Sequence, residues 1–148
     1  MEYAFLDTNV ILRYLLRDDE LKAQHCLKLL EKAERRDINL LTTDLVIAEL
    51  VWVLESPVTY NLPGDKIRDL LLPIILLPGL KLPGKKLYRR IFELYVDQEI
   101  AFIDAFNAIH MQKQGLSQIY SYDSDFDRVA GISRVEPLRA ILEIDKQL

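Results

Sequence analysis

Short apolar runs alternate along the chain with longer amphipathic stretches. The first run, Tyr3–Leu6, is almost wholly apolar, which predicts a strand that is buried on both faces. Similar runs predict strands at residues 39–41, 80–82 and 119–122, with a small edge strand that ends at Val135. Apolar positions at helical spacing predict helices at residues 9–16, 20–36, 45–55, 65–72, 84–96, 102–113 and 126–129, and from Pro137 onward. This order of elements predicts an α/β fold with a parallel sheet and helices on both of its faces.

Acidic residues occur where such a fold places its ligand-binding groups. Parallel α/β sheets bind ligands beyond the carboxyl ends of their strands. Asp7 directly follows the first predicted strand, and Asp123 directly follows the fourth. Asp104 lies in the first turn of a predicted helix, and Glu49 lies in the middle of another. Asp7 and Asp123 are therefore expected at the binding edge of the sheet.

The sequence around these acids is apolar and contains no nearby basic residue. Burial of the Glu49 carboxylate in the run LVIAELVWVL would cost free energy unless a positive charge met it. Two carboxylates about 4 Å apart repel each other by about 4 kcal/mol at an effective dielectric constant of 20, and a divalent cation reverses the sign of that energy. A ligand set of oxygen atoms, with no His or Cys beside it, favours Mg²⁺ or Mn²⁺ over Zn²⁺.

Two of these acids also have ordinary structural interpretations. Asp7 precedes a helix and is suited to cap it. Asp104 is a favourable charge in the first turn of its helix, because the helix dipole attracts anions there. Glu49 has no comparable alternative, so it carries the most weight in the hypothesis of a shared cation.

Four motifs resemble those of a known family in order and spacing. They are DTNV at Asp7–Val10, IAEL at 47–50, IDAFNAI at 103–109 and YSYDSDF at 120–126. Together they resemble the PIN-domain family, and within it the bacterial and archaeal VapC-type toxins, over nearly the whole chain. The resemblance implies a single domain over residues 1–148 with a 5′-nuclease-like, three-layer fold. In that fold, helices flank a twisted parallel sheet of four to five strands.

The resemblance also implies which residues form the site. The family's catalytic and metal-binding acidic quartet is matched by Asp7, Glu49, Asp104 and Asp123. Asp125 matches a further acid, for which metal binding and capping of the following short helix are both open. Residues expected to line the pocket are Thr8, Asn9, Asn107 and Ser121. Ser121 stands where the family commonly has Thr, and it keeps the hydroxyl group.

The activity implied by the resemblance is that of an endoribonuclease. Such an enzyme requires Mg²⁺ or Mn²⁺ and hydrolyses RNA phosphodiester bonds with a metal-activated water. The resemblance further implies a toxin with a protein antitoxin as its partner, and a homodimer. Two alternatives stay open, a PIN-like binding module with an idle metal site and a nuclease that acts on DNA. An aspartyl-phosphate phosphatase is disfavoured, because the first strand is followed by D-T-N and not by D-x-D.

Contacts to RNA phosphates require basic side chains. The segment at 81–90 contains four of them that form i,i+4 pairs at helical spacing, namely Lys85, Lys86, Arg89 and Arg90. Arg13, on the helix after Asp7, is a second candidate. An ordinary solvated helix face is the alternative interpretation of this basic stripe.

Composition limits these hypotheses. The 148 residues are 50% hydrophobic and the mean hydropathy is +0.04, which is typical of a globular domain. The single cysteine excludes an intrachain disulfide, and the absence of a long apolar stretch or secretory signal predicts a cytoplasmic protein without a membrane segment. The formal net charge of −4 argues at first against a nucleic-acid partner. The four acids of the predicted site equal that excess, so the acidic balance indicates a local requirement for a cation.

Overall fold

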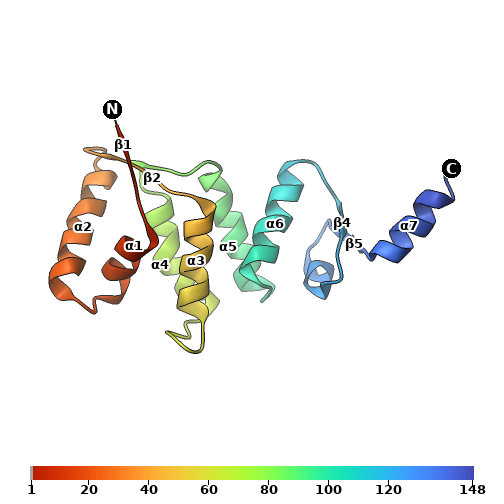
Figure 1. Ribbon diagram of the computed structural model, residues 1–148, viewed down its shortest axis with the longest axis horizontal. Helices are drawn as coiled ribbons and strands as arrows, with labels where there is room; N and C mark the ends of the chain where they lie inside the picture. The colour runs from red at the N-terminus through yellow and green to blue at the C-terminus, as the bar shows by residue number, and fades with distance from the viewer. Residues whose placement is uncertain (1) are drawn as a thin grey trace. The chain divides into compact units, whose positions relative to one another are not determined.

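Two compact units make up the chain in the computed structural model, which describes residues 2–148. The first unit ends at Arg89 and the second runs from Arg90 to Leu148, so the boundary falls within helix α5 (Tyr88–Asp97). Figure 1 labels the helices and strands along the chain. The single domain expected over residues 1–148 remains a prediction.

The first unit contains a parallel three-stranded sheet with helices in its connections. In chain order its elements are β1 (Tyr3–Phe5), α1 (Thr8–Leu16), α2 (Glu20–Glu34), β2 (Asn39–Leu41), α3 (Asp44–Glu55), α4 (Gly64–Ile75), β3 (Leu80–Lys81) and the 3₁₀ helix η1 (Lys85–Leu87). The strand order is β1-β2-β3, with Phe5 paired to Leu41 and Leu41 paired to Lys81. Parallel neighbours need crossover connections, which α1 and α2, and then α3 and α4, provide.

The second unit contains a parallel pair of strands among helices. After α5 its elements are α6 (Phe102–Lys113), β4 (Gln118–Tyr120), the 3₁₀ helix η2 (Ser124–Arg128), β5 (Ser133–Val135) and α7 (Pro137–Asp145). Tyr120 of β4 pairs with Val135 of β5. Parallel strands that alternate with helices confirm the predicted α/β fold, and the described strands pair as a group of three and a group of two. Every described helix falls short of the length and apolarity needed to cross a membrane.

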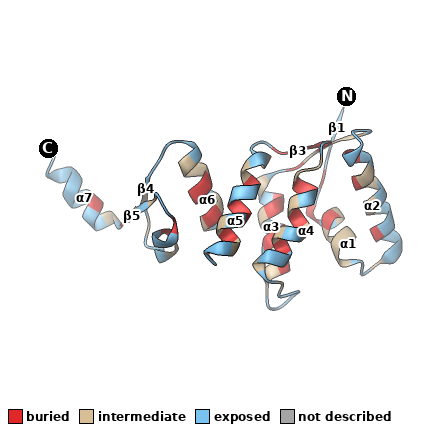
Figure 2. Cartoon of the chain, turned by 180° about the vertical axis from the view of Figure 1, so that it is seen from behind, coloured by how far each residue is buried: buried red, intermediate tan, exposed pale blue. Residues whose placement is uncertain are grey.

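Each unit buries its own apolar side chains. Figure 2 shows buried residues in red on α3, α4, α5 and α6, whereas α7 is mostly exposed. In the first unit the largest fully buried aliphatic side chains of the helices are Ile11, Ile47, Leu50, Leu54, Ile67, Leu71 and Ile75. In the second unit, the ring of Phe102 packs 5.5 Å from that of Phe92 and 5.9 Å from that of Tyr95, measured between centroids. This aromatic cluster anchors the first turn of α6, the turn that also carries Asp104.

Two predictions about the elements are wrong. The strand expected to be buried on both faces has exposed side chains at Tyr3, Ala4 and Phe5, and only Leu6 after it is buried. The helix expected to end at Leu72 continues to Ile75. Pro73 lies inside α4 on its exposed side, and the buried Ile74 and Ile75 hold the last turn against the core.

Candidate metal centre

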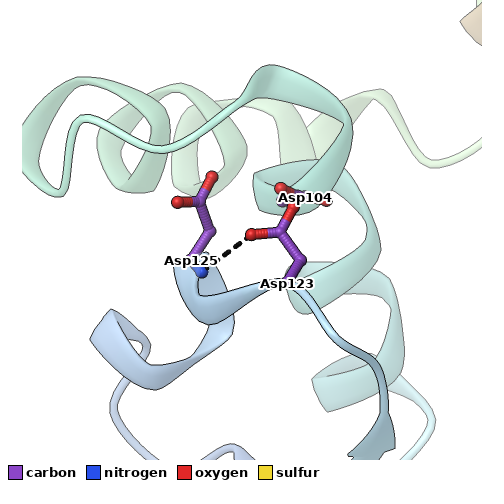
Figure 3. Close-up of side chains that lie close together, drawn as sticks. All are labelled: Asp104, Asp123 and Asp125. Carbon is purple, nitrogen blue, oxygen red and sulfur yellow. Dashed lines mark hydrogen bonds between the residues drawn. The ribbon is translucent and has the colours of Figure 1, made fainter.

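Three carboxylates come together in the second unit, as Figure 3 shows. Asp104 lies in the first turn of α6, Asp123 precedes η2, and Asp125 lies within η2. One ligand oxygen from each residue lies within 4.8 Å of the other two. The cluster thus contains two members of the predicted quartet together with Asp125, for which the sequence left two roles open.

Hydrogen bonds fix the segment that carries Asp123 and Asp125. The N–H of Asp123 donates to Oγ of Ser121 (3.0 Å), and the N–H of Asp125 donates to Oδ1 of Asp123 (2.9 Å). Asp123 therefore caps η2, and the capping role that the sequence offered for Asp125 is wrong. Oδ2 of Asp125 instead accepts a hydrogen bond from the N–H of Ala101 (3.2 Å), the residue that precedes α6. This bond links η2 to the helix that carries Asp104.

The pKa of Asp104 is raised to about 6. Burial of the carboxyl group is the largest cause, and the charges of Asp123 and Asp125 and the hydrogen bonds to them raise it further. Among residues 2–148, no salt bridge involves any of these three carboxylates. Crowded carboxylates of this kind hold a proton or attract a cation. Because every donor is a carboxylate oxygen, the residues fit a hard divalent cation such as Mg²⁺ or Mn²⁺.

Asp7, Thr8 and Glu49 belong to the first unit. Asp7 follows β1 and immediately precedes α1, and its exposed side chain makes no hydrogen bond that caps the helix. Asp7 therefore occupies the N-cap position of α1 without the side-chain hydrogen bond that a capping role would require. The buried hydroxyl of Thr8 donates a hydrogen bond to Oε2 of Glu49 (2.8 Å), which joins α1 to α3.

Glu49 is exposed, so the expectation that it is buried among apolar side chains is wrong. The buried residues of α3 are Val46, Ile47, Leu50, Val51 and Leu54. Glu49 lies on another side of the helix with Leu45 and Trp52, which are 81% and 66% exposed. The sequence of α3 is apolar on both sides, so its pattern does not reveal which side faces the core. The hypothesis for Glu49 therefore rests on its match to the motif and on its bond to Thr8.

The predicted quartet is divided between the two units. Asp7 and Glu49 lie in the first unit, whereas Asp104 and Asp123 lie in the second. The structure groups Thr8 with Glu49, and it groups Asp104 with Asp123 and Asp125. The action of the four acids as one set remains a prediction.

Thr42 is a supporting residue that lies outside the four sequence motifs. It is fully buried, and its hydroxyl donates to the backbone carbonyl of Leu6 (2.9 Å). The N–H of Leu6 donates to the carbonyl of Leu41 (2.8 Å), and the N–H of Thr42 donates to that of Lys81 (3.1 Å). Thr42 thus continues the strand pairing up to the residue before Asp7. A hydroxyl residue directly after a buried strand is the signal that could have identified it.

The other residues predicted to line the pocket, Asn9, Asn107 and Ser121, differ in their exposure and contacts. Asn9 is exposed in the first turn of α1, and Asn107 is exposed on α6 one turn after Asp104. Ser121 is half-buried, and its hydroxyl contacts the N–H of Asp123. Ser121 therefore supports the acidic cluster directly, while the roles of Asn9 and Asn107 remain predictions.

The ammonium group of Lys85 forms hydrogen bonds within the first unit. Its Nζ donates to the backbone carbonyls of Leu77 and Leu80, each at 2.8 Å. Burial lowers the pKa of Lys85, and the positive charge of Arg36 lowers it further. The ammonium group of Lys85 therefore stabilises the turn before β3, and a role in RNA binding would compete with these bonds.

The other predicted basic residues are more accessible. Lys86 and Arg89 are exposed in the first unit. Arg90, in the second unit, is exposed and hydrogen-bonds to a side chain of α6. Arg13 forms a salt bridge with Asp18 (2.9 Å) and keeps 42% of its side chain exposed. Lys86 and Arg89 are therefore the better-placed candidates for contacts to phosphate groups.

One family is matched by the sequence. The family model of the PIN domain matches residues 4–132, which includes all five acidic residues discussed above, namely Asp7, Glu49, Asp104, Asp123 and Asp125. None of the curated proteins matches the chain.

Proposed function

The chain belongs to the PIN domain family, and from this membership we propose that it is a divalent-metal-dependent endoribonuclease. PIN domains are generally nucleases, and this fold class suits such a role. The observation that carries the proposal is the cluster of Asp104, Asp123 and Asp125, whose ligand oxygens lie within 4.8 Å of one another. Oxygen ligands at this spacing suit Mg²⁺ or Mn²⁺.

The acidic residues have distinct tasks in this proposal. A bound divalent cation supplies a Lewis acid that activates water and stabilises negative charge on a phosphate group. Asp104, Asp123 and Asp125 would hold that cation. Glu49 is one candidate to orient the attacking water, because Thr8 occupies only its Oε2 and leaves Oε1 available. Asp123 is the other candidate.

Asp7 and Glu49 are proposed to serve the same reaction as the acids of the second unit. The support is their match to the family's acidic quartet within the matched segment, and the exposure of both carboxylates. If this is correct, Asp7→Asn and Asp104→Asn each abolish metal-dependent cleavage while leaving the protein folded. Cleavage that survives in Asp7→Asn would remove the first unit's acids from the reaction.

The finer proposal is that the enzyme is the toxin of a toxin–antitoxin pair. It rests on the likeness of the four motifs to VapC-type toxins, which act on RNA in the cytoplasm and are paired with a protein antitoxin. The exposed Lys86 and Arg89 would contribute contacts to RNA phosphates. A homodimer is part of the same proposal.

Cleavage assays on purified protein test the proposed function. Wild type, Asp104→Asn and Asp97→Asn are incubated with Mn²⁺ and with single-stranded RNA or DNA of the same sequence. Asp97 is an exposed aspartate of the second unit outside the cluster, so its variant is the matched control. We expect wild type and Asp97→Asn to cut RNA and Asp104→Asn to be inactive. Equal cutting of DNA would favour a DNA nuclease, and no cutting of either would favour a binding module.

A further inference from the structure

One guanidinium group binds both ends of the acidic loop, defined here as residues 121–127. Arg134, on β5, donates from Nε and Nη2 to the two carboxylate oxygens of Asp127, at 3.0 and 3.2 Å. Its Nη1 donates to the backbone carbonyl of Ser121 at 3.2 Å and to Oε1 of Glu136 at 3.3 Å. Arg134 therefore contacts the first and the last residue of the loop from a neighbouring strand.

The side chain of Arg134 is far less exposed than its partners. It is 18% exposed, against 54% for Asp127 and 58% for Glu136. Exposed ion pairs contribute little, because solvent screens them and both side chains lose freedom. A guanidinium with two-pronged contact to a carboxylate has a fixed geometry that a lysine does not reproduce. The contacts of Arg134 thus hold the backbone of the acidic loop in place and also put a positive charge beside it.

Further hydrogen bonds connect the backbone that Arg134 holds to the acidic cluster. The backbone carbonyl of Ser121 accepts a hydrogen bond from Arg134, and Oγ of Ser121 accepts one from the N–H of Asp123. Asp123 in turn accepts the N–H of Asp125 at its Oδ1. A displacement of Ser121 would therefore move Asp123 and Asp125, the two loop residues of the cluster.

We propose that Arg134 is a positioning residue, which holds the acidic loop in the shape in which Asp123 and Asp125 bind a divalent cation together with Asp104. This inference rests on the proposed metal-dependent function. Arg134 lies beyond residues 4–132, the segment matched by the family, so its contacts and not the family match identify it.

Substitution of Arg134 can test the proposal, because loss of its charge and loss of its hydrogen bonds would change the cation affinity in opposite directions. Removal of a positive charge near a cation site strengthens cation binding if only electrostatic attraction matters. Loss of the loop's shape weakens cation binding instead, and partners of metal ligands typically change affinity by about 10- to 100-fold. The two effects have opposite directions.

The experiment measures Mn²⁺ affinity of the full chain by titration calorimetry, for wild type, Arg134→Gln, Arg134→Lys and Arg139→Gln. Arg139 forms an exposed pair with Glu143 on α7 (3.0 Å), so its variant loses the same charge outside the loop. We expect Mn²⁺ affinity to fall about 10- to 100-fold in both variants of Arg134, and to stay constant or rise slightly in Arg139→Gln. Arg134→Lys keeps the charge and so isolates the geometry of the guanidinium group.

Amide hydrogen exchange of the metal-free proteins gives a second readout. The N–H groups of Asp123 and Asp125 should exchange faster in the Arg134 variants, while those of α6 keep the wild-type rate. Rapid exchange throughout the second unit of Arg134→Gln would mean that this variant has lost its structure there. The Mn²⁺ affinity of Arg134→Lys is then the test, and a wild-type affinity in that variant overturns the proposal. Equal affinity of Arg134→Gln and Arg139→Gln also overturns it. Absence of Mn²⁺ binding by wild type overturns the proposed metal-dependent function as well.

Discussion

The hydroxyl of Thr8 donates a 2.8 Å hydrogen bond to Oε2 of Glu49, which joins residues 41 positions apart in the sequence. Thr8 is buried at the start of α1, whereas Glu49 is exposed on α3. The bond therefore fixes a solvent-exposed carboxylate from its buried side. A carboxylate held in this way is restricted in its rotamers, which favours a defined role in catalysis.

Thr8→Val tests the function of this bond. Valine has nearly the same shape as threonine but donates no hydrogen bond, so the Glu49 carboxylate gains freedom. Under the proposed role of Glu49 in orienting the attacking water, we expect RNA cleavage to fall about 10-fold, the lower end of the loss typical of hydrogen-bond partners at metal sites. The free energy of unfolding should fall by only about 1 kcal/mol. Thr8→Ser keeps the hydroxyl and should retain most of the activity, and full activity of Thr8→Val would show that the bond is only structural.

Asp104→Asn should stabilise the metal-free protein at neutral pH. In the unfolded chain the carboxyl ionises near its usual pKa of about 3.9, whereas the folded protein holds the proton up to about pH 6. Between these values the folded state binds more protons, so this group lowers the free energy of unfolding as the pH rises. After allowance for solvent screening, we expect about 1 kcal/mol of stabilisation above the raised pKa, or about 2–4 °C in Tm.

Thermal unfolding at several pH values checks this expectation. The difference between Asp104→Asn and wild type should vanish below about pH 4, where the carboxyl is protonated in both states. Mn²⁺ should raise the Tm of wild type above the raised pKa and leave that of Asp104→Asn unchanged. An equal shift by Mn²⁺ in both proteins would place the cation elsewhere.

Thr42→Val should destabilise the first unit. The substitution removes the hydroxyl that donates a hydrogen bond to the carbonyl of Leu6. Both residues are fully buried, so the carbonyl loses its partner away from solvent. An unsatisfied buried acceptor costs about 1–3 kcal/mol, which chemical denaturation would measure. Thr42→Ser keeps the donor and should lose less. Unchanged stability of Thr42→Val would mean that water reaches the Leu6 carbonyl.

Local pattern was sufficient for part of the fold. The helix at Phe102–Lys113 has the predicted bounds, because its apolar spacing is regular and Gly115, which has a positive φ of 76°, follows it. Asp104 was therefore placed correctly in the first turn. The acid cluster was predicted in part, since Asp104 and Asp123 do lie together.

Positions that depend on partners distant in the sequence could not be predicted in this way. The apolar pattern of β1 is that of a buried strand, but its side chains are exposed, because burial depends on which elements cover the sheet. The exposure of Glu49 depends on which of two apolar sides of α3 meets the core. The role of Arg134 depends on three partners, Ser121, Asp127 and Glu136, that no motif connects to it.

Lys85 and Lys86 are neighbours with opposite expected roles. Lys85→Met removes two hydrogen bonds to backbone carbonyls and should lower the free energy of unfolding by about 1–3 kcal/mol. Lys86→Met removes only an exposed charge, so stability should be unchanged.

RNA binding should show the reverse pattern. Each phosphate contact contributes about one unit to the slope of log affinity against log salt concentration. We expect Lys86→Met to reduce that slope by about one unit, and Lys85→Met to leave it unchanged once the protein is folded. Fluorescence anisotropy with a catalytically inactive Asp104→Asn background measures binding without cleavage. If Lys85→Met reduces the slope and Lys86→Met does not, the ammonium of Lys85 leaves its carbonyl partners to bind RNA, and the two residues exchange roles.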